Sequence, residues 1–157
     1  MILVALLIAC GAAAATGILF QPGPWYQALE KPPFTPPDWL FPIAWTVIYL
    51  LAAGAGARLA RRPGAGLAMA LWAAQIALNT LWTPVFFGAH LIGTGLSVLA
   101  LLWVVVAALT ACAWRLDRVA GAMLLPYLLW LCLAFALNLA IWQANPPLPL
   151  PPPLPAG

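Results

Sequence analysis

Five long apolar runs dominate the chain, and short polar segments separate them. The runs cover about residues 1–20, 40–59, 67–87, 92–114 and 119–142. A helix needs about 20 apolar residues to cross the hydrocarbon core of a bilayer, because each residue adds only about 1.5 Å. The pattern therefore predicts an all-α membrane protein, a bundle of five transmembrane helices that forms one domain over residues 1–145.

The connection between the first two runs is the longest, and it reads QPGPWYQALEKPPFTPPD over residues 21–38. Its prolines prevent a continuous helix and stiffen the backbone. Its aromatic residues make it too apolar to extend into water. We expect this first loop to fold over the bundle as a lid, with a short helical turn around residues 25–30, and Asp38 to cap the second long helix.

Composition and charge narrow the class of protein. Of the 157 residues, 66% are hydrophobic and 6% are charged, which is too little charge to cover a water-soluble domain. The formal net charge is +3, and the basic residues lie scattered between the apolar runs. This excludes the clustered basic face of a nucleic-acid-binding protein, so the lipid bilayer is the expected surrounding.

The arginines indicate an orientation in the membrane. They flank the second and fourth loops, at Arg58, Arg61, Arg62, Arg115 and Arg118. Both loops fall on the same side of a five-helix bundle, which the positive-inside rule places in the cytoplasm. The first loop, His90 and the C-terminus are then expected on the opposite side.

The two ends of the chain need separate interpretation. Leu7 to Cys10 match the pattern that precedes a lipoprotein cleavage site, but no basic residue comes before them and the apolar run continues through Ala15. We therefore expect an uncleaved first helix. The segment PPLPLPPPLPAG, residues 146–157, is expected to be a disordered or polyproline-II tail.

Several kinds of chemistry lack the residues that they need. No Asp, Glu or Lys lies near the middle of an apolar run, which argues against a proton-coupled pump or a retinal Schiff base. The single histidine, His90, lies in a tight turn, and the three cysteines show no zinc or haem-attachment spacing. We expect no metal site, no obligatory cofactor and no acid–base active site.

Aromatic and amide side chains recur at spacings of three and four residues, which places them on one face of each helix. The third run carries Trp72, Gln75, Asn79, Trp82 and Phe86; the fifth carries Tyr127, Trp130, Ala134 and Asn138; the second carries Pro42, Trp45, Tyr49, Ala52 and Gly56. Interfacial tryptophans and interhelical amide bonds explain part of this pattern by packing alone. Trp45, Trp103 and Trp130 lie deeper than an interfacial belt requires, which favours a ligand cavity under the first loop.

Small residues on the third run suggest an oligomer. Gly66, Ala70 and Ala74 repeat at every fourth position, a spacing that lets two helices approach closely. We expect a homodimer through this helix.

Three segments carry a resemblance to a known family. They are WYQALEKPPFTPPDWLFPIAWTVIY (25–49), ALNTLWTPVFFGAH (77–90) and PYLLWLCLAFALN (126–138). In their order and spacing the chain resembles the TspO/MBR family, the tryptophan-rich sensory proteins that include the mitochondrial translocator protein, or peripheral benzodiazepine receptor. The resemblance extends over about residues 9–142.

The resemblance implies a five-helix bundle whose first loop closes a pocket for porphyrins, such as protoporphyrin IX and haem. Carried over by motif, the ligand-binding positions are Trp25, Tyr26, Trp39, Pro42, Trp45, Asn79, Trp82, Phe86, Trp130, Ala134 and Asn138. Bacterial members are linked to light-driven porphyrin breakdown through two pocket tryptophans, here Trp45 and Trp130. If haem binds, His90 is the one histidine that the chain offers.

We expect a bacterial member of the family, in either the inner or the outer membrane, and the chain departs from the animal members at two places. The segment LNLAIWQANPP lacks the Tyr and Arg of the animal cholesterol motif, so specific sterol recognition is not expected. Thr94 stands where the animal members have Trp.

Three functions remain open on these grounds. The first is a porphyrin-binding sensor or transporter that regulates tetrapyrrole metabolism. The second is a light- or oxygen-dependent porphyrin-degrading enzyme, for which illumination with protoporphyrin IX would give a protein-dependent product. The third is a regulatory membrane partner without a small ligand, whose activity would be lost with the proline-rich tail.

Overall fold

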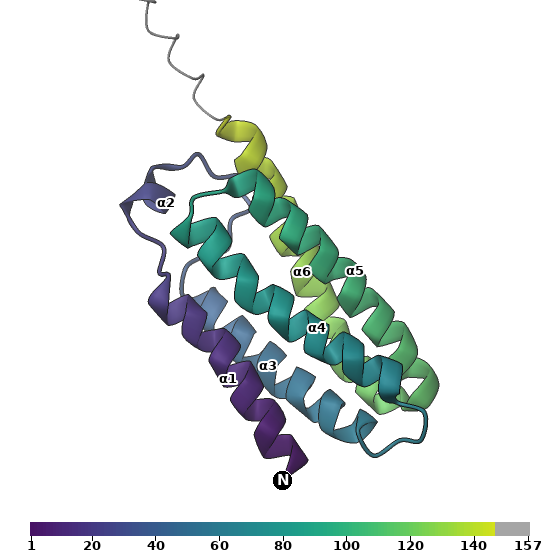
Figure 1. The fold of residues 1–157 in the computed structure, drawn as a ribbon. Coiled ribbons are helices and arrows are strands. Elements are labelled where there is room, and N and C mark those ends of the chain that lie inside the picture. The colour runs from purple at the N-terminus through teal and green to yellow at the C-terminus, as the bar shows by residue number, and fades with distance from the viewer. Residues whose placement is uncertain (147–157) are drawn as a thin grey trace, which may run out of the picture.

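A computed structural model describes residues 1–146 of the chain, and these residues form helices and connecting loops without any strand (Figure 1). The helices are α1 (Ile2–Leu19), α2 (Pro24–Ala28), α3 (Leu40–Leu59), α4 (Gly66–Thr83), the π-helical segment η1 (Pro84–Gly88), α5 (Ile92–Leu116) and α6 (Arg118–Ala144). The predicted tail lies, apart from Pro146, outside the described residues.

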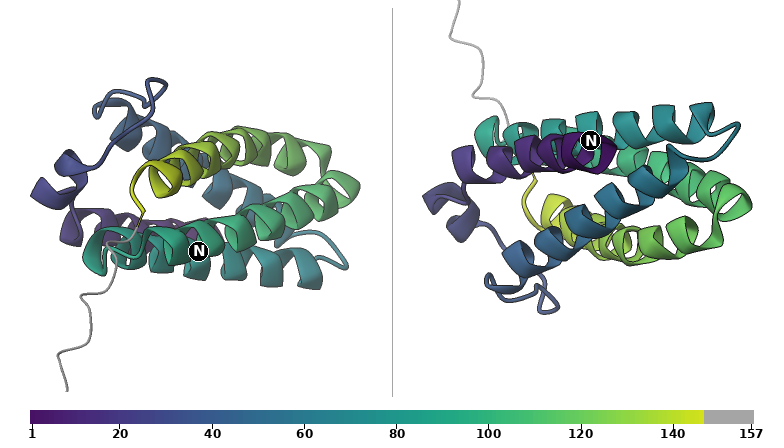
Figure 2. Two further views of the ribbon diagram at one scale, coloured as in Figure 1. Left: turned by 90° about the horizontal axis from the view of Figure 1, so that it is seen from above. Right: turned by 90° about the horizontal axis from the view of Figure 1, so that it is seen from below.

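The five long helices lie side by side as a bundle (Figure 1). The segment that contains α2 lies at one end of this bundle, and the α3–α4 loop and the α5–α6 turn lie at the other (Figure 2). We call these the lid end and the arginine end. The predicted helices are confirmed to within a few residues, and α2 confirms the short helical turn in the first loop.

Four of the long helices, α1, α3, α5 and α6, are long and apolar enough to cross a membrane. The fifth predicted span differs, because the apolar run of α4, which is as long as α1, is interrupted by Gln75 and Asn79. Pro84 ends the α-helix early, since it has no amide hydrogen to donate to the preceding turn. The chain then continues as η1, in which the Ala89 amide donates to the Pro84 carbonyl at 2.8 Å.

At the arginine end the core consists of small and aliphatic side chains. Ala52, Ala53 and Gly56 on α3 are buried, and a Cβ atom added to Gly56 would lie 2.8 Å from the Trp72 indole nitrogen. That nitrogen donates to the Ala52 carbonyl at 2.8 Å, which joins α4 to α3. Small residues therefore allow α1, α3 and α4 to pack closely around Trp72.

One predicted helix cap, that of α3, is not observed. Asp38 was expected to cap α3 through its side chain, but the cap residue is Trp39 and no side chain bonds to the first turn. The Asp38 carbonyl accepts instead from the Phe41 amide, at 3.3 Å, in a turn that leads into the helix. The two prolines before Asp38 fix the direction in which the chain enters α3, and the Asp38 carboxylate does not reach the free amides of the first turn.

Candidate functional site: aromatic rings and buried amides at the lid end

One face of α4 turns its aromatic and amide side chains into the bundle. Gln75 is 1% exposed and Asn79 is 4% exposed, and Trp82 follows them on the same face. The π-helical segment continues the stripe, because its wider turn keeps Phe86, 2% exposed, in line with Trp82. The predicted spacing therefore corresponds to one inward face.

The rings at the end of this stripe form a cluster with the first loop, which we call the aromatic cluster: Trp25, Tyr26, Trp82, Phe86 and Phe87. Trp82 and Phe86 stack with their centroids 4.9 Å apart and their planes 18° from parallel. Trp25 and Tyr26 of α2 meet the Phe86 ring edge to face, at 5.8 Å and 6.2 Å. The lid residues are thus in contact with the α4 stripe.

Deeper in the bundle, a chain of hydrogen bonds links α4 to α6. The Asn79 Nδ2 amide donates to the Tyr127 hydroxyl oxygen at 3.1 Å, and that hydroxyl donates to Gln75 Oε1 at 3.1 Å. Trp45 lies edge to face on the Tyr127 ring, with centroids 6.0 Å apart, and beside Tyr49 at 5.3 Å. Trp45 therefore borders the polar chain on the α3 side.

Three buried polar atoms have no hydrogen-bond partner among residues 1–146: Gln75 Nε2, Trp82 Nε1 and Asn138 Oδ1. The other end of the Asn138 amide is satisfied, since Nδ2 donates to the Ile92 carbonyl at 3.2 Å. A buried polar atom without a partner costs about 1–3 kcal/mol. The Trp82 donor and the Asn138 acceptor lie beside the Phe86 ring, and the Gln75 donor lies deeper on the same face of α4, a combination that suits an aromatic ligand that also carries polar groups.

The first loop is attached to the bundle at two points. Asn145, at the end of α6, accepts from the Glu30 amide and donates to the Glu30 carbonyl, both at 3.0 Å. Trp25 stacks on the His90 ring at 4.1 Å, with the planes 14° apart. His90 takes a left-handed backbone with a φ of 58° at the tight turn before α5. These contacts keep the α2 rings against Phe86 and Phe87 of η1.

Charged groups of the loop surround Tyr26 on its outer side. The Lys31 ammonium lies 4.7 Å from the centroid of the Tyr26 ring, while its hydrogen bonds go to the Gln27 and Leu29 carbonyls. Burial raises the pKa of the Tyr26 hydroxyl, and the nearby Asp38 carboxylate raises it further. Tyr26 is therefore a neutral hydroxyl over the neutral pH range.

Other predicted positions lie at the surface of the bundle. Trp39 is 64% exposed, and Pro42 borders a shallow hollow of about 290 Å³ on the outside of α3. Trp130 borders an apolar groove of about 470 Å³ between α3 and α6, and its ring meets Phe41 edge to face at 5.6 Å. Ala134 packs partly buried against the core near Trp130. The eleven positions are therefore divided between the interior and the outer face of α3 and α6.

Sequence reasoning missed three residues that contribute contacts at the lid end. Phe87 packs against Tyr26 and Trp82, but it is adjacent to Phe86 and would face away in a regular α-helix. Phe41 and Asn145 lie one residue inside a helix start and one residue beyond a helix end. An Asn just after an apolar run is a helix-end signal, which gave a local hint without revealing its partner in the first loop.

Comparison with known proteins places these features in context. Residues 2–143 match the sequence model of the TspO/MBR family. Protein CrtK of Rhodobacter capsulatus is 46% identical over 143 residues, which cover 88% of this chain and 89% of that protein. The tryptophan-rich sensory protein of Cereibacter sphaeroides is 47% identical over 139 residues, 88% of each chain. The translocator protein of Homo sapiens is 35% identical over 127 residues, 77% of this chain and 75% of that protein.

Proposed function

Because the chain belongs to the TspO/MBR family of membrane sensors and translocator proteins, we propose that it binds a porphyrin in the aromatic cluster. The ligand class includes protoporphyrin IX and haem. As an integral membrane receptor or transporter, the protein would use this binding to regulate tetrapyrrole metabolism.

The observation that carries the proposal is the group of three unpartnered polar atoms at Gln75, Trp82 and Asn138. A porphyrin combines a large aromatic plate with two carboxylates, so it offers stacking surface and hydrogen-bond acceptors together. The amide of Gln75 and the indole of Trp82 are donors, which match carboxylate oxygens. An alkyl lipid chain would leave both donors unsatisfied.

The closed arrangement of the lid end suggests how a flat ligand is admitted. Trp82 and Phe86 are already stacked, and Trp25 covers the edge of Phe86. A plate would have to separate α2 from η1 or take the place of one ring. The first loop, which is attached through Asn145 and His90, is the segment that can move with the fewest broken contacts.

Titration of the detergent-purified protein with protoporphyrin IX, followed by porphyrin absorbance and tryptophan quenching, tests this proposal. We expect Trp82→Leu combined with Phe86→Leu to raise the Kd by about tenfold or more, since stacked rings contribute beyond their buried area. Trp114→Phe is the matched control, because Trp114 lies on α5 next to the arginine end. An unchanged Kd in the double variant, with an unchanged unfolding temperature, would refute binding at this cluster.

A second candidate function, porphyrin breakdown, is favoured by the position of Trp45. Its ring lies next to the Tyr49 and Tyr127 rings, so three oxidisable side chains border the buried amides. Trp130 lies farther out, beside Phe41. Illumination of the complex under oxygen tests this activity: a product that forms with the wild type but not with Trp45→Phe supports it, whereas the same product from free porphyrin does not.

Self-association through α4 remains part of the proposal. Gly66 and Ala70 are exposed, and a Cβ atom added to Gly66 would meet no other atom within 4 Å. Ala74 is partly buried at the edge of this face. The outer face of α4 is thus smooth enough to approach a second copy closely.

A further inference from the structure

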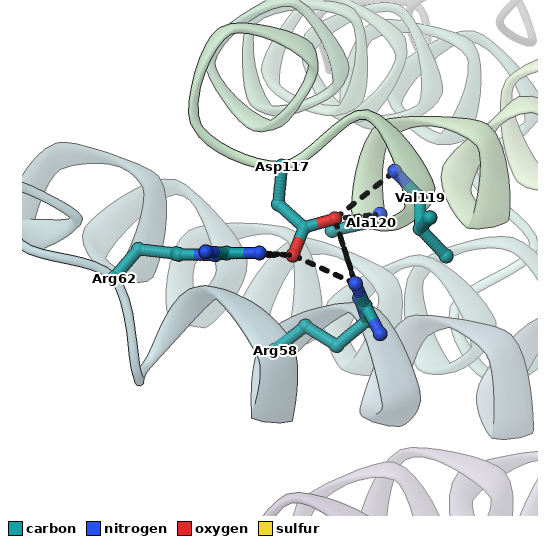
Figure 3. Close-up of polar contacts among 5 residues, drawn as sticks. All are labelled: Arg58, Arg62, Asp117, Val119 and Ala120. Atoms are coloured by element: carbon teal, nitrogen blue, oxygen red, sulfur yellow. Dashed lines mark hydrogen bonds and ion pairs between the residues drawn. The ribbon is translucent and has the colours of Figure 1, made fainter.

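The arginine end contains a carboxylate that holds two guanidinium groups in fixed positions (Figure 3). Asp117 Oδ1 accepts from Arg58 Nε at 3.3 Å and Nη2 at 3.1 Å, and Oδ2 accepts from Arg62 Nε at 3.1 Å and Nη2 at 2.6 Å. Oδ1 also accepts from the amides of Val119 and Ala120. The Asp117 side chain is only 3% exposed, so this geometry is built into the fold.

The two arginines retain binding capacity after these contacts. Each guanidinium has five N–H donors, and the bonds to Asp117 engage Nε and Nη2 of each. The side chains of Arg58 and Arg62 are 43% and 47% exposed, so a ligand can approach both guanidinium groups from outside. One carboxylate against two guanidiniums leaves a net charge of +1. We call this pair the arginine cradle.

The surroundings of the arginine cradle strengthen its positive charge. Arg61 in the α3–α4 loop, Arg115 in the last turn of α5 and Arg118 at the start of α6 are also exposed at this end. The chain has only three acidic residues, and the other two, Glu30 and Asp38, belong to the first loop at the lid end. Five arginines against one aspartate give this end a net charge of +4 from its side chains.

An exposed tryptophan indicates the depth of this end in the membrane. Trp114, next to Arg115, is 45% exposed, and its ring packs over Gly121 in the first turns of α6. Tryptophans at the ends of spanning helices lie at the level of the lipid headgroups. Asp117 follows Trp114 within one helical turn, and it holds the arginine cradle at this level, where lipid phosphates are found.

We propose that the arginine cradle binds the phosphate of an anionic phospholipid in the leaflet at this end. Guanidinium groups bind phosphate oxygens in pairs, and the pairing with Asp117 fixes both groups before the ligand arrives. Arg61, Arg115 and Arg118 add attraction for an anionic leaflet without being fixed by the carboxylate. This site is independent of the porphyrin site at the lid end.

Lipid retention by the full-length protein tests the proposal. The protein is mixed in detergent with equal amounts of dioleoyl phosphatidylglycerol and dioleoyl phosphatidylcholine, and bound lipid is counted by native mass spectrometry. We expect the wild type to retain the anionic lipid preferentially, and Lys31→Gln, a charge removed from the lid end, to leave that preference unchanged. Equal retention of both lipids by the wild type would overturn the proposal.

Two variants separate the arginine cradle from diffuse attraction. Arg58→Gln/Arg62→Gln/Asp117→Asn removes one net positive charge and leaves amides that can bond to each other, whereas Arg115→Gln/Arg118→Gln removes two charges and leaves the Asp117 pairs intact. Diffuse attraction, at about fivefold per charge, makes the second variant the weaker binder. The proposal expects the first to be weaker, and the opposite order would overturn it.

Two further measurements complete the test. If the triple variant loses its wild-type near-ultraviolet circular dichroism, Arg58→Lys/Arg62→Lys replaces it, since it keeps the charge but loses the paired donors; a wild-type preference there overturns the proposal. Soluble glycerol phosphate is added as a competitor at the concentration of the lipid. If glycerol phosphate displaces the bound lipid as effectively as excess phosphatidylglycerol does, the site binds soluble phosphate. That result would overturn the assignment to lipid.

Discussion

Asp117 illustrates how much a single polar residue controls in a chain with so few charges. It caps α6 through two backbone amides and at the same time joins the α5–α6 turn to the end of α3 through Arg58 and Arg62. Its carboxylate has partners on both oxygens, which is the condition under which a buried charge is tolerated. Removing Asp117 would therefore affect three helices at once.

The stability of the protein should depend on the ionisation of Asp117. The hydrogen bond from Arg62 holds the pKa of this carboxyl well below its ordinary value, and the Ala120 amide and Arg58 act in the same direction against the effect of burial. Because the folded pKa lies below the unfolded one, of about 3.9, the stabilisation is present above that pH and is lost as the pH falls. We expect the unfolding temperature in detergent to decrease when the pH is lowered below about 4.

Asp117→Asn should start from a lower unfolding temperature and lack this dependence on pH. Asp38→Asn, which removes an exposed carboxylate at the lid end, is the control and should follow the wild-type curve. Parallel curves for the wild type and Asp117→Asn would contradict the assignment.

Gly56 should tolerate no side chain. An added Cβ atom would lie 2.8 Å from the Trp72 indole nitrogen and 3.0 Å from Leu6 Cδ1, and the hydrogen bond of Trp72 to Ala52 prevents the ring from moving aside. We expect Gly56→Ala to lower stability by about 1–3 kcal/mol. Gly11→Ala is the matched control on α1, where nothing lies within 4 Å and the better helix propensity of Ala should be neutral or favourable. Thermal unfolding followed by circular dichroism measures both.

At the scale of the elements, the first loop and η1 together determine the shape of the lid end. The break at Pro84 turns α4 into a π-helical segment, which brings both Phe86 and Phe87 against the loop residue Tyr26. The loop is held by these ring contacts and by the hydrogen bonds between the Asn145 side chain and the Glu30 backbone. The first loop and η1, which lie far apart in sequence, thus pack together at the lid end.

Asn145→Ala should loosen this lid without unfolding the bundle. The substitution removes both hydrogen bonds to the Glu30 backbone, each of which contributes about 0.5–1.5 kcal/mol. We expect faster hydrogen exchange at residues 21–38 and faster porphyrin association and dissociation, with a smaller change in Kd. Gln143→Ala, exposed on the same helix end, is the control. Unchanged exchange in Asn145→Ala would show that other contacts hold the loop.

Across the whole molecule, side-chain size divides the bundle into two regions. Alanine and leucine side chains dominate the core at the arginine end, while indole, phenol and phenyl rings fill the space between the helices and the first loop at the lid end. Indole and phenol rings also carry polar atoms that need hydrogen-bond partners when they are buried. The buried polar atoms without partners in the described part of the chain accordingly belong to Gln75, Trp82 and Asn138.

The proposed homodimer can be tested on the outer face of α4. Ala70 is exposed in the middle of the small-residue face, so Ala70→Leu should prevent close approach of two α4 helices and convert dimers to monomers. Ala111→Leu, also exposed but on α5, is the matched control. Light scattering coupled to size exclusion in detergent gives the mass of each variant. A dimer that persists in Ala70→Leu would place the interface elsewhere.

The sequence alone was enough to predict the helical bundle, the positions of its long helices and the inward face of α4. These features follow from hydrophobic periodicity and from prolines, which act over a few residues. The same spacing selected most of the candidate site residues, and the resemblance to the TspO/MBR family added Trp25, Tyr26 and Trp39. Local sequence patterns were sufficient for features whose physical cause acts over only a few residues.

Only the tertiary structure decided which of these residues meet. Asp38 was expected to cap a helix and does not, whereas Asp117, with a similar local signal, does so and also binds two arginines from another helix. Trp82 and Trp39 are the same residue type, yet one lies in the aromatic cluster and the other is 64% exposed. Such outcomes depend on contacts between segments far apart in the chain, because burial and pairing are properties of the packed helices rather than of any one stretch of sequence.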